Sequence, residues 1–591
     1  MSFDDYCEHS LRTVVSDVLV VGGGAAGSRA AVAAAEAGAR TALVLKGDLG
    51  RSGSTCLPAR GPHGSAYQAA DGCSAADDDS PDQHYRDIVD AGLGMADPHL
   101  ARILADEAPE RLGDLISWGF VPDPEPEPSH GRPHWAGYSC FATKPRAHGI
   151  WDISAGHAGA LVAAAIPQIR RLGVTIVPHV MLSDLLVQDG ICVGALGIDG
   201  DGELVVFRAA TVILATGGVG QLFSRAAASP EVTGDGFAMA LRAGAKLVNL
   251  EFMQFMIRSL DGGPVLWMLC PEVCNPQGES VLGRYLPSGL TPEEACEART
   301  LHYPFSTRDA SRWIDIAICS DAQCSRVEGQ DGTTTLAYDS SRCAARARAG
   351  LRARPQHHYP GPSTGSVPLP DKPTKVAHLA HASNGGLRVS SRAESTLPGL
   401  YAVGETAAGP HGADRLGGNM LPSTQVFGRR AGFSAAACAR GGPPPLSAET
   451  LTLPRARIAR ILSQKGNRRS SDVKHQLQEK ISQNLSVVRN AAGLTALLDE
   501  VAHLREEELL DCTGRLDRRE LCKVLELDNL LLVAEAMGRA ALMRTESRGS
   551  HFRTDFPALD DDQWATNITC RLVNGHPALH KDSLCETKGR G

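Results

Sequence analysis

Residues 16–27 have the sequence SDVLVVGGGAAG, in which an apolar run leads directly into a glycine-rich turn. The run DVLVV predicts a short buried strand, and the small residues at 28–39 predict a helix. Gly22 allows a tight turn, Gly24 lets the backbone approach a pyrophosphate, and Gly27 lets the helix pack closely on the strand. The N-terminus of that helix would present unpaired N–H groups to the phosphates. The pattern predicts a dinucleotide-binding turn, with a purely structural turn as the alternative, and does not identify the nucleotide.

Length and charge limit the kind of protein this can be. The 591 residues allow roughly three or four domains of about 150 residues each. The formal net charge of −8 indicates no excess of basic residues that could bind a phosphate backbone, so we expect no nucleic-acid partner. No apolar run reaches the length of about 18 residues that a transmembrane helix needs, so we expect no membrane span.

The N-terminus and the cysteines indicate the compartment. Asp4, Asp5 and Glu8 stand where a secretory signal needs positive charge, and no apolar h-region follows. We therefore expect a cytoplasmic protein whose 16 cysteines are mostly reduced and buried. No C-x-x-C pair occurs and no full zinc ligand set is present, so we predict neither a metal site nor an iron–sulfur cluster in this chain.

The second predicted strand, residues 41–45, ends differently from that of a typical NAD-binding unit. Such units place Asp or Glu there to hold the ribose hydroxyls, whereas this chain has Lys46. The following segment RSGST, residues 51–55, offers small hydroxyl and glycine residues that suit close approach to a flat ring or a phosphate. A plain polar loop is the alternative for this segment.

The rest of the chain alternates helical and strand patterns. Helices are predicted over 84–90, 99–118, 150–171, 237–243 and 431–440. Strands are predicted over 174–177, 191–198, 204–208, 211–214, 387–389 and 399–405. A hairpin turn, DGDG at 199–202, joins two of these strands. Beyond residue 447 we expect helices as far as Gly549 and irregular structure after it.

The character of the sequence changes over 248–376, where short helical patterns mix with proline-rich loops. This stretch reads as an inserted domain. We expect the first part of a nucleotide-binding domain over 1–245, an inserted domain over 246–378, the second part of the first domain over 379–445, and a C-terminal helical domain over 446–591.

Several motifs then occur in one order along the chain. They are GGGAAG at 22–27, RSGST at 51–55, ATGG at 215–218, TGDG at 233–236, HASNGG at 381–386, GLYAVGE at 399–405, HGADRLGGN at 411–419 and ESRGSHFR at 546–553. Together they resemble the succinate dehydrogenase/fumarate reductase flavoprotein family, which includes L-aspartate oxidase. The resemblance covers nearly the whole chain, and the segment from 399 to 419 is its most specific part.

The resemblance implies an α/β fold with FAD as cofactor. A Rossmann-type FAD-binding domain is interrupted by an α+β capping domain and followed by a C-terminal helical domain. By the same resemblance, the residues that contact FAD are Gly22, Gly24, Ala25, Ala26, Gly27, Lys46, Ser52, Ser54, Thr55, Ala215, Thr216, Gly217, Asp235, Glu405, Arg415, Asn419 and Leu421. The substrate would lie between the cap and the flavin ring, with a hydride passing between flavin N5 and a substrate carbon.

Two residues within the family motifs suit the binding of a carboxylate substrate. Arg415 can grip a carboxylate through a bidentate fork. His381 would supply a second donor near the same oxygens. A surface salt bridge or a satisfied core position is the alternative for each of them.

The chain departs from the family at three places. Gly53 stands where some members carry the His that links FAD covalently, so we predict non-covalent FAD. Met256 replaces the His of the substrate-binding H-P-T motif, and a Met cannot usefully hydrogen-bond a carboxylate. The proton-carrying Arg expected in the cap is absent from 266–272. Arg258 is the predicted substitute, with Arg308 as a further catalytic candidate and Arg312 as another orienting group.

These departures predict an FAD-dependent oxidoreductase that acts on a CH–CH bond of a small carboxylate other than succinate or fumarate. Such a substrate would turn an apolar side toward Met256 and Trp267. One alternative is an amino-acid oxidase like L-aspartate oxidase. Another is the flavoprotein subunit of an electron-transfer complex with an iron–sulfur partner, because Arg258, 263–264 and Trp267 faintly resemble the adenylylsulfate reductase alpha subunit. A flavin-binding protein without catalysis is the last alternative.

Overall fold

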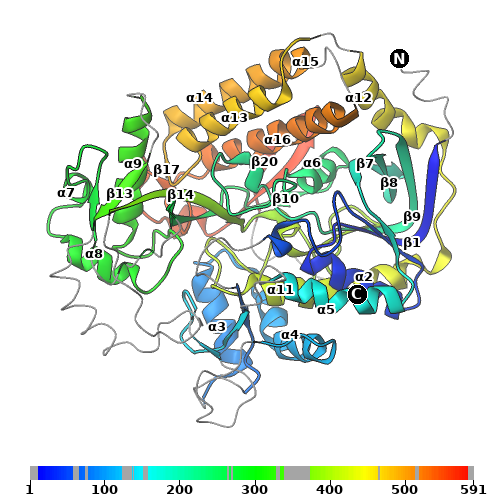
Figure 1. Ribbon diagram of the computed structural model, residues 1–591, viewed down its shortest axis with the longest axis horizontal. Helices are drawn as coiled ribbons and strands as arrows, with labels where there is room; N and C mark the ends of the chain where they lie inside the picture. The colour runs from blue at the N-terminus through cyan, green and yellow to red at the C-terminus, as the bar shows by residue number, and fades with distance from the viewer. Residues whose placement is uncertain are drawn as a thin grey trace.

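A seven-stranded sheet forms the centre of the nucleotide-binding part of the chain, toward the right of Figure 1. The computed structural model describes residues 11–57, 65–72, 78–122, 136–137, 139–150, 158–261, 265, 267, 271–327, 333–337, 373–463, 466–512 and 518–582. Across the sheet the strands are β6 (Thr175–Val177), β2 (Thr41–Val44), β1 (Arg12–Val21), β9 (Leu204–Leu214), β8 (Ile191–Asp199) and β7 (Val180–Gln188), and β16 (Leu400–Ala402) pairs with β9 beside this path.

The half of this sheet that carries the glycine turn is parallel. The strands β6, β2, β1, β9 and β16 run in one direction, whereas β8 and β7 run antiparallel to their neighbours. Val18, Leu19 and Val20 of β1 are fully buried. A parallel strand buried on both faces needs a continuous apolar run, which is why the sequence DVLVV folds as its core.

Three helices cover one face of the sheet, and Figure 1 shows them close together. They are α2 (Ala25–Glu36), α5 (Gly159–Arg171) and α11 (Met420–Cys438). A Cβ on Gly432 of α11 would lie 2.5 Å from the carbonyl oxygen of Ala30 in α2. The two backbones therefore approach closely only because small residues face each other, and this brings the C-terminal part of the nucleotide domain onto the N-terminal glycine turn.

A smaller layer lies beyond these helices, at the bottom of Figure 1. It contains α3 (Pro81–Ala91), α4 (Pro98–Ser117) and a three-stranded sheet in the order β3 (Ser65–Gln68), β5 (Ala147–Ile150) and β4 (Ala136–Gly137). Ser80 caps α3 and Asp97 caps α4, each followed by a proline in the first turn. Both helices were predicted from sequence, and they start slightly earlier than expected.

The inserted region forms a separate lobe at the left of Figure 1. Its sheet runs in the order β11 (Met253–Ser259), β14 (Thr374–Ser383), β13 (Thr334–Ala337) and β12 (Glu272–Cys274), with helices α7 (Leu282–Tyr285), α8 (Pro292–Arg299) and α9 (Arg312–Val327). Ile257, Trp267 and Ile314 belong to its own hydrophobic core. The domain boundary expected after residue 378 falls inside β14, so one strand crosses from the cap to the nucleotide domain.

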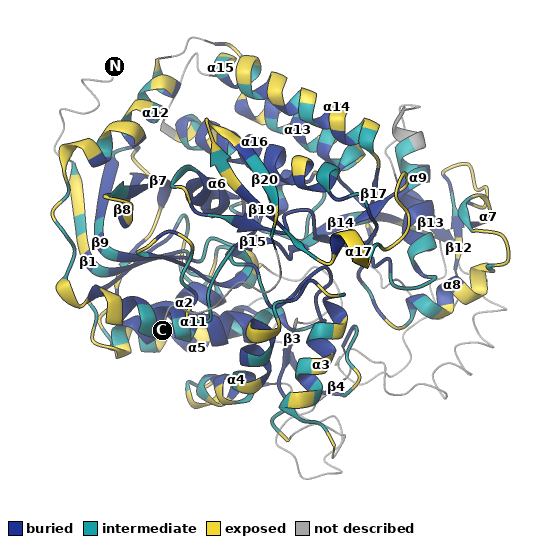
Figure 2. Cartoon of the chain, turned by 180° about the vertical axis from the view of Figure 1, so that it is seen from behind, coloured by how far each residue is buried: buried dark blue, intermediate teal, exposed yellow. Residues whose placement is uncertain are grey.

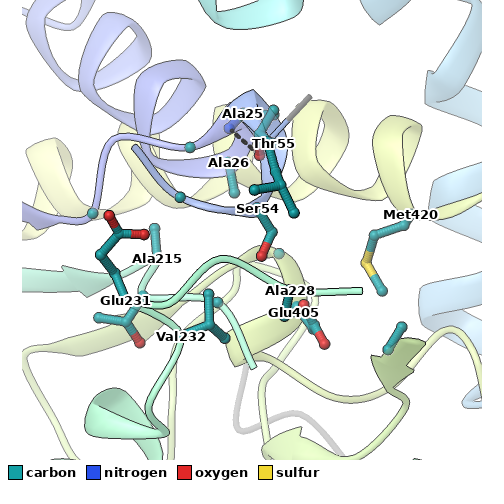
Figure 3. Close-up of a pocket in the computed structure, with 18 of the residues that line it drawn as sticks. Ala25, Ala26, Ser54, Thr55, Ala215, Ala228, Glu231, Val232, Glu405 and Met420 are labelled. Carbon is teal, nitrogen blue, oxygen red and sulfur yellow. Dashed lines mark hydrogen bonds between the residues drawn. The ribbon is translucent and has the colours of Figure 1, made fainter. Parts of the chain in front are cut away.

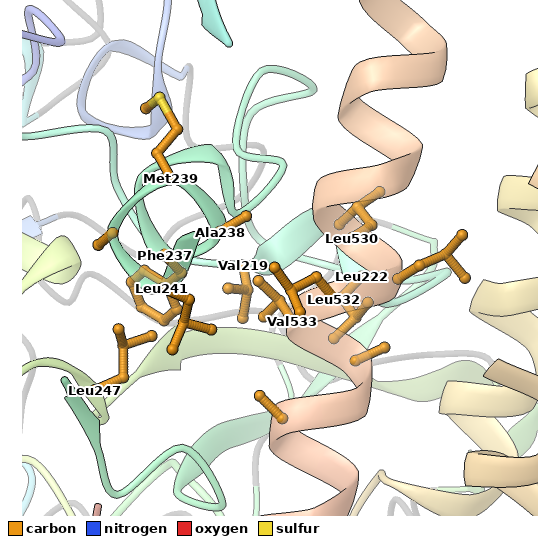
Figure 4. Packing of buried hydrophobic residues seen from close by; sticks show 14 of the residues in the cluster. Val219, Leu222, Phe237, Ala238, Met239, Leu241, Leu247, Leu530, Leu532 and Val533 are labelled. Carbon is orange, nitrogen blue, oxygen red and sulfur yellow. The ribbon is translucent and has the colours of Figure 1, made fainter. Parts of the chain in front are cut away.

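The C-terminal region lies along the top of the molecule and packs on the nucleotide domain. Its helices are α12 (Thr452–Leu462), α13 (Ser470–Asn484), α14 (Ala491–His503), α15 (Leu509–Asp511), α16 (Arg518–Met543) and α17 (Asp561–Trp564). Leu530 and Val533 of α16 belong to the same hydrophobic cluster as Phe237 and Leu241 of α6 (Asp235–Arg242), part of which is drawn in Figure 4. The helices α13 and α14 turn exposed residues outward and buried residues toward α16 (Figure 2).

The last part of the chain is not irregular as expected. It forms a sheet in the order β15 (Gly386–Leu387), β10 (Leu247–Val248), β19 (Asn567–Val573) and β20 (His576–Asp582), while β17 (Val488–Arg489) pairs with β18 (Phe552–Arg553). The turn between β19 and β20 is Asn574-Gly575, with φ of 51° and 80°. Asn-Gly with two positive φ angles is a strong hairpin signal, and the prediction overlooked it.

Three other sequence-based expectations also need correction. The helix expected over 150–171 begins at Gly159, because Ile150 ends β5. The closing helix begins at Met420 and not at residue 431, since its proline lies in the first turn, where no helical N–H is lost. The strands expected over 204–208 and 211–214 are the single strand β9. The strand β7 was not predicted.

No helix within the described ranges has both the length and the apolarity that a membrane span requires.

Candidate active site

A cavity of about 780 Å³ lies where the parallel strands of the central sheet end. Val21, Val44 and Ala215, at or just after the carboxyl ends of β1, β2 and β9, form one wall. Met256 and Arg258 of the cap sheet contribute to another. Ligands of open α/β sheets bind at this edge, and the volume suits a dinucleotide-sized group together with a small substrate.

The glycine turn is built so that backbone faces this cavity, as an FAD pyrophosphate requires. A Cβ on Gly22, whose φ is 101°, would lie 2.3 Å from the carbonyl oxygen of Ala215. A Cβ on Gly27 would lie 1.8 Å from the carbonyl oxygen of Gly22. Gly24 is the N-cap of α2, and no side chain caps this helix. The helix therefore directs its N-terminal N–H groups and its positive dipole end into the cavity, which fits a pyrophosphate.

Small hydroxyl residues hold the loop beside the turn. Thr55 Oγ1 accepts a hydrogen bond from the Ala25 amide at 3.3 Å, drawn as the dashed line in Figure 3. Ser54 Oγ accepts from the Ser229 amide at 3.1 Å. In the same view Glu405 lies across the cavity from Ser54 and Thr55. The loop is thus fixed against both α2 and the segment after β9.

Lys46 lies at the end of β2 and makes two ion pairs across the molecule. Its Nζ is 2.8 Å from Asp235 Oδ2 in α6 and 2.6 Å from Glu526 Oε1 in α16. Burial alone would lower the pKa of Lys46, but these two carboxylates raise it above its usual value. Lys46 therefore remains charged and joins the cavity to the C-terminal region.

Glu405 lies in the segment after β16, beside the end of the cap strand β14. Its Oε1 accepts a hydrogen bond from the Ser383 amide at 2.8 Å. A Cβ on Gly218 would lie 2.3 Å from the same oxygen, so a side chain at this position would displace the Glu405 carboxylate. Burial raises the pKa of Glu405, although the amide of Ser383 and the charge of Arg415 act against this.

Most residues predicted to contact FAD do line this cavity. They are Gly22, Gly24, Ala25, Ala26, Lys46, Ser52, Ser54, Thr55, Ala215, Thr216, Gly217, Asp235, Glu405, Arg415 and Leu421. Gly27 and Asn419 do not line it. Gly27 packs beneath the turn, and Asn419 Oδ1 is 2.9 Å from His84 Nε2 in α3. These two residues support the walls of the cavity, and their predicted contact with FAD stays a prediction.

Arg415 and His381 meet on the cavity wall. Arg415 Nη2 is 3.2 Å from His381 Nε2, and Arg415 Nε donates to Gln254 Oε1 at 3.2 Å. A guanidinium can only donate, so His381 Nε2 must accept and the ring proton must be on Nδ1. Burial and the charge of Arg415 lower the pKa of His381 to about 3, which keeps the ring neutral. His381 Nδ1 is buried without a hydrogen-bond partner in the described structure.

The other predicted catalytic residues divide into two groups. Arg258 and Met256 line the cavity. Arg308 does not: its Nη2 donates to the carbonyl of Ala91 at 3.0 Å, and its guanidinium lies 4.2 Å from the ring centroid of Phe141.

Two further side chains near the cap also point elsewhere. Arg312 donates to the carbonyl of Thr307. Trp267 is buried in the core of the cap, so the expectation that it faces the substrate is wrong. Residues 263–264 lie outside the described residues.

Three residues of the site were not singled out from sequence. Gln254 makes the hydrogen bond to Arg415, and Tyr303 and Cys140 line the cavity. The Cys140 Sγ accepts a hydrogen bond from the Tyr303 amide at 3.2 Å. Gln254 could have been found, because it lies two positions before Met256 and alternate residues of a strand share a face. Tyr303 and Cys140 belong to no motif that indicates this contact.

Comparison of the sequence and fold with known proteins also indicates an FAD-binding protein. A family model described as an FAD binding domain matches residues 17–278 and 333–421, and one described as fumarate reductase flavoprotein C-term matches residues 474–584. The chain belongs to the succinate dehydrogenase/fumarate reductase flavoprotein family. This flavoprotein is an FAD-dependent oxidoreductase, and the expected cofactor and α/β fold class are confirmed.

Three relatives illustrate the similarity. A fumarate reductase (CoM/CoB) subunit of Methanothermobacter marburgensis is 32% identical over 92% of this flavoprotein and 94% of its own length. L-aspartate oxidase of Caulobacter vibrioides is 30% identical over 94% of this chain and 97% of its own. The solved structure of Mycobacterium smegmatis Sdh1 in complex with UQ1 has a TM-score of 0.78 and 27% identity, and the match covers 97% and 95% of the two chains.

Proposed function

We propose that this flavoprotein oxidises or reduces the CH–CH bond of a small carboxylate other than succinate or fumarate. The observation that carries the proposal is the Arg415–His381 pair on the wall of the cavity, 3.2 Å apart. A buried guanidinium beside a neutral imidazole is a well-suited pair for one carboxylate group. Met256, which lines the same cavity, offers no hydrogen bond to a second carboxylate placed as in a C4 dicarboxylate.

Each residue of the pair has a distinct part. The guanidinium of Arg415 supplies charge and donors to the carboxylate, and its Nε bond to Gln254 fixes its direction. Because His381 Nε2 accepts from Arg415, the Nδ1–H is the donor that remains for a carboxylate oxygen. The carboxylate would thus be held by two groups, and the carbon chain would be turned toward the flavin.

The FAD-contacting residues are part of the same proposal. The glycine turn would hold the pyrophosphate, while Ser54, Thr55 and Glu405 would border the ribityl and ring portion. The chemistry that FAD supplies when bound is hydride exchange with a substrate carbon. The protein would supply orientation and charge around that carbon. Gly53 supports non-covalent binding, because it offers no side chain for a link.

Anaerobic titration of the FAD-loaded protein with candidate carboxylates tests this function. We expect flavin bleaching by a carboxylate of the correct class, and weak or no bleaching by succinate. Bleaching by succinate at a useful rate would overturn the interpretation of Met256. The variant Arg415→Gln should retain FAD and lose bleaching. The surface variant Arg284→Gln, which removes an exposed partner of Glu279, should behave as wild type.

A second candidate is oxidation of an amino acid with electrons passed to oxygen. The observation that favours it is the 30% identity to an L-aspartate oxidase over nearly the full length of both chains. Hydrogen peroxide release on addition of a panel of amino acids distinguishes it from the first function.

An electron-transfer protein is proposed as a partner. One relative is named as one subunit of a fumarate reductase, which supports an assembly with another chain. Purification of the tagged protein from its own host, followed by mass spectrometry and iron analysis, tests for an iron–sulfur partner. Isolation of a single chain that accepts and releases electrons at full rate contradicts it.

A further inference from the structure

Besides Lys46 and Arg415, the cavity is lined by a third cation, Arg258, which lies on the cap strand β11. From this arrangement we infer that the substrate is an elongated diacid, with one acidic group on Arg415, an apolar segment on Met256 and a second acidic group on Arg258. This inference rests on the proposed function and specifies its substrate class.

Strand geometry directs these side chains to one side. Residues at alternate positions of β11 share a face, and Gln254, Met256 and Arg258 form such a set despite a register irregularity after Gln254. Gln254 contacts Arg415, and Met256 and Arg258 line the cavity. The intervening Phe255 and Ile257 are buried in hydrophobic cores on the opposite side. Along β11 the chain therefore presents, in this order, Gln254 in contact with Arg415, the apolar side chain of Met256 and the cation Arg258.

The charge of Arg258 is not used elsewhere in the described structure. Its side chain makes no hydrogen bond or ion pair with any described residue. The acidic residues that line the cavity do not compensate this charge. Asp235 pairs with Lys46, Asp48 pairs with His179, and Glu405 accepts a hydrogen bond from the Ser383 amide. Glu231 lies beside Gly47, at the nucleotide end of the cavity. A half-buried guanidinium is costly unless an anion compensates it, and its nitrogens can only donate hydrogen bonds. Holding an anion suits it better than carrying a proton.

The spacing along β11 favours a diacid longer than a C4 compound for contact with both cations. At about 3.3 Å per residue, the backbone positions of Gln254 and Arg258 are roughly 13 Å apart. The carboxyl carbons of a C4 diacid are separated by only three C–C bonds of about 1.5 Å each. Both guanidinium groups can lean toward the middle, so an extended diacid of about 6–10 carbons in total fits the strand.

Binding of saturated α,ω-dicarboxylates of 4 to about 12 carbons to the FAD-loaded full-length protein tests this inference. The matching monocarboxylates are titrated in parallel, and isothermal calorimetry measures each dissociation constant without turnover. We expect affinity for the diacids to rise with length to an optimum at about 6–10 carbons. Arg258→Gln should weaken the best diacid by roughly 10- to 100-fold and leave the monocarboxylates unchanged. Arg258→Lys should recover part of the loss, and Arg284→Gln should change nothing.

The outcomes separate this inference from the proposed function. If monocarboxylates bind and depend on Arg415, but the diacids gain nothing with length or Arg258→Gln has no effect on them, the inference fails and the proposed function stands. If no carboxylate of any length binds, both fail. Flavin content and melting temperature of each variant are measured first, and Arg258→Met provides a second neutral variant if Arg258→Gln does not fold.

Discussion

Gln254 of the cap strand accepts a hydrogen bond from Arg415 Nε at 3.2 Å, and its own Nε2 donates to the Arg415 carbonyl at 3.4 Å. Gln254 is fully buried. The two bonds join the strand that begins the cap to the loop that carries the proposed carboxylate anchor. The cap and the anchor are therefore positioned together, and Gln254 acts as a positioning residue for Arg415.

Replacing Gln254 with Glu should weaken substrate binding. The new carboxylate would pair with Arg415 and neutralise the charge meant for the substrate. We expect the dissociation constant of a bleaching carboxylate to rise by about tenfold or more, with the rate of flavin reduction at saturation changed much less. Gln168→Glu is the matched control, because Gln168 accepts from Arg171 on α5 away from the cavity. An equal loss in both variants would contradict the positioning role.

Replacing His381 with Ala should lower kcat/KM by roughly 10- to 100-fold, the usual effect of losing a hydrogen bond to a charged group. The pKa of His381 is about 3, so the ring stays neutral between pH 5 and 8. The variant should therefore show the same shape of pH–rate profile as wild type over that range. His475→Ala, at an exposed position on α13, is the control. An inflection near pH 6.5 that disappears in the variant would show that His381 titrates in the working range.

The nucleotide half of the fold was predictable because its signals are local. The apolar strand, Gly22 and Gly27 lie within a dozen residues, and sterics leave few other conformations for them. β7 was missed because Asp184 interrupts its apolar pattern, and Asp184 is satisfied by Arg242 and Arg457 from distant helices. Such partners cannot be read from a local pattern. The Asn574-Gly575 hairpin did have a local signal, which was overlooked.

The site residues were predictable where residues from two sequence motifs contact each other in the folded chain. Arg415 and His381 come from two motifs and meet on one wall. Arg308 and Trp267 were also candidates, yet Phe141 and the cap core hold them away from the cavity. Those contacts join parts of the chain far apart in sequence, so only the folded chain reveals them.

FAD should be released completely by acid precipitation. Gly53 has φ 82° and ψ 161°, a conformation that only glycine adopts readily, so the linking His of some family members would not fit here without moving the loop. We expect all yellow colour in the supernatant after trichloroacetic acid treatment, measured by flavin absorbance, and none in the pellet. Gly53→His should lose FAD affinity without gaining a covalent link. Flavin retained in the wild-type pellet would contradict this prediction.

Asp414, directly before Arg415, should make stability depend on pH. It is fully buried, its Oδ2 accepts from Ser306 Oγ at 2.5 Å, and Arg308 Nε is 3.9 Å away. Burial raises its pKa to about 7, with the Arg308 charge acting against it. A carboxyl whose folded pKa exceeds its unfolded value stabilises the protein at low pH, and this stabilisation is lost as the pH rises from about 4 to about 7.

The variant Asp414→Asn tests this dependence. Its side chain cannot ionise, so its melting temperature relative to wild type should increase over that pH range and then level off. Asp106→Asn, at an exposed ion pair on α4, controls for the loss of a carboxylate. A constant difference between Asp414→Asn and wild type across the range would show that Asp414 is ionised throughout.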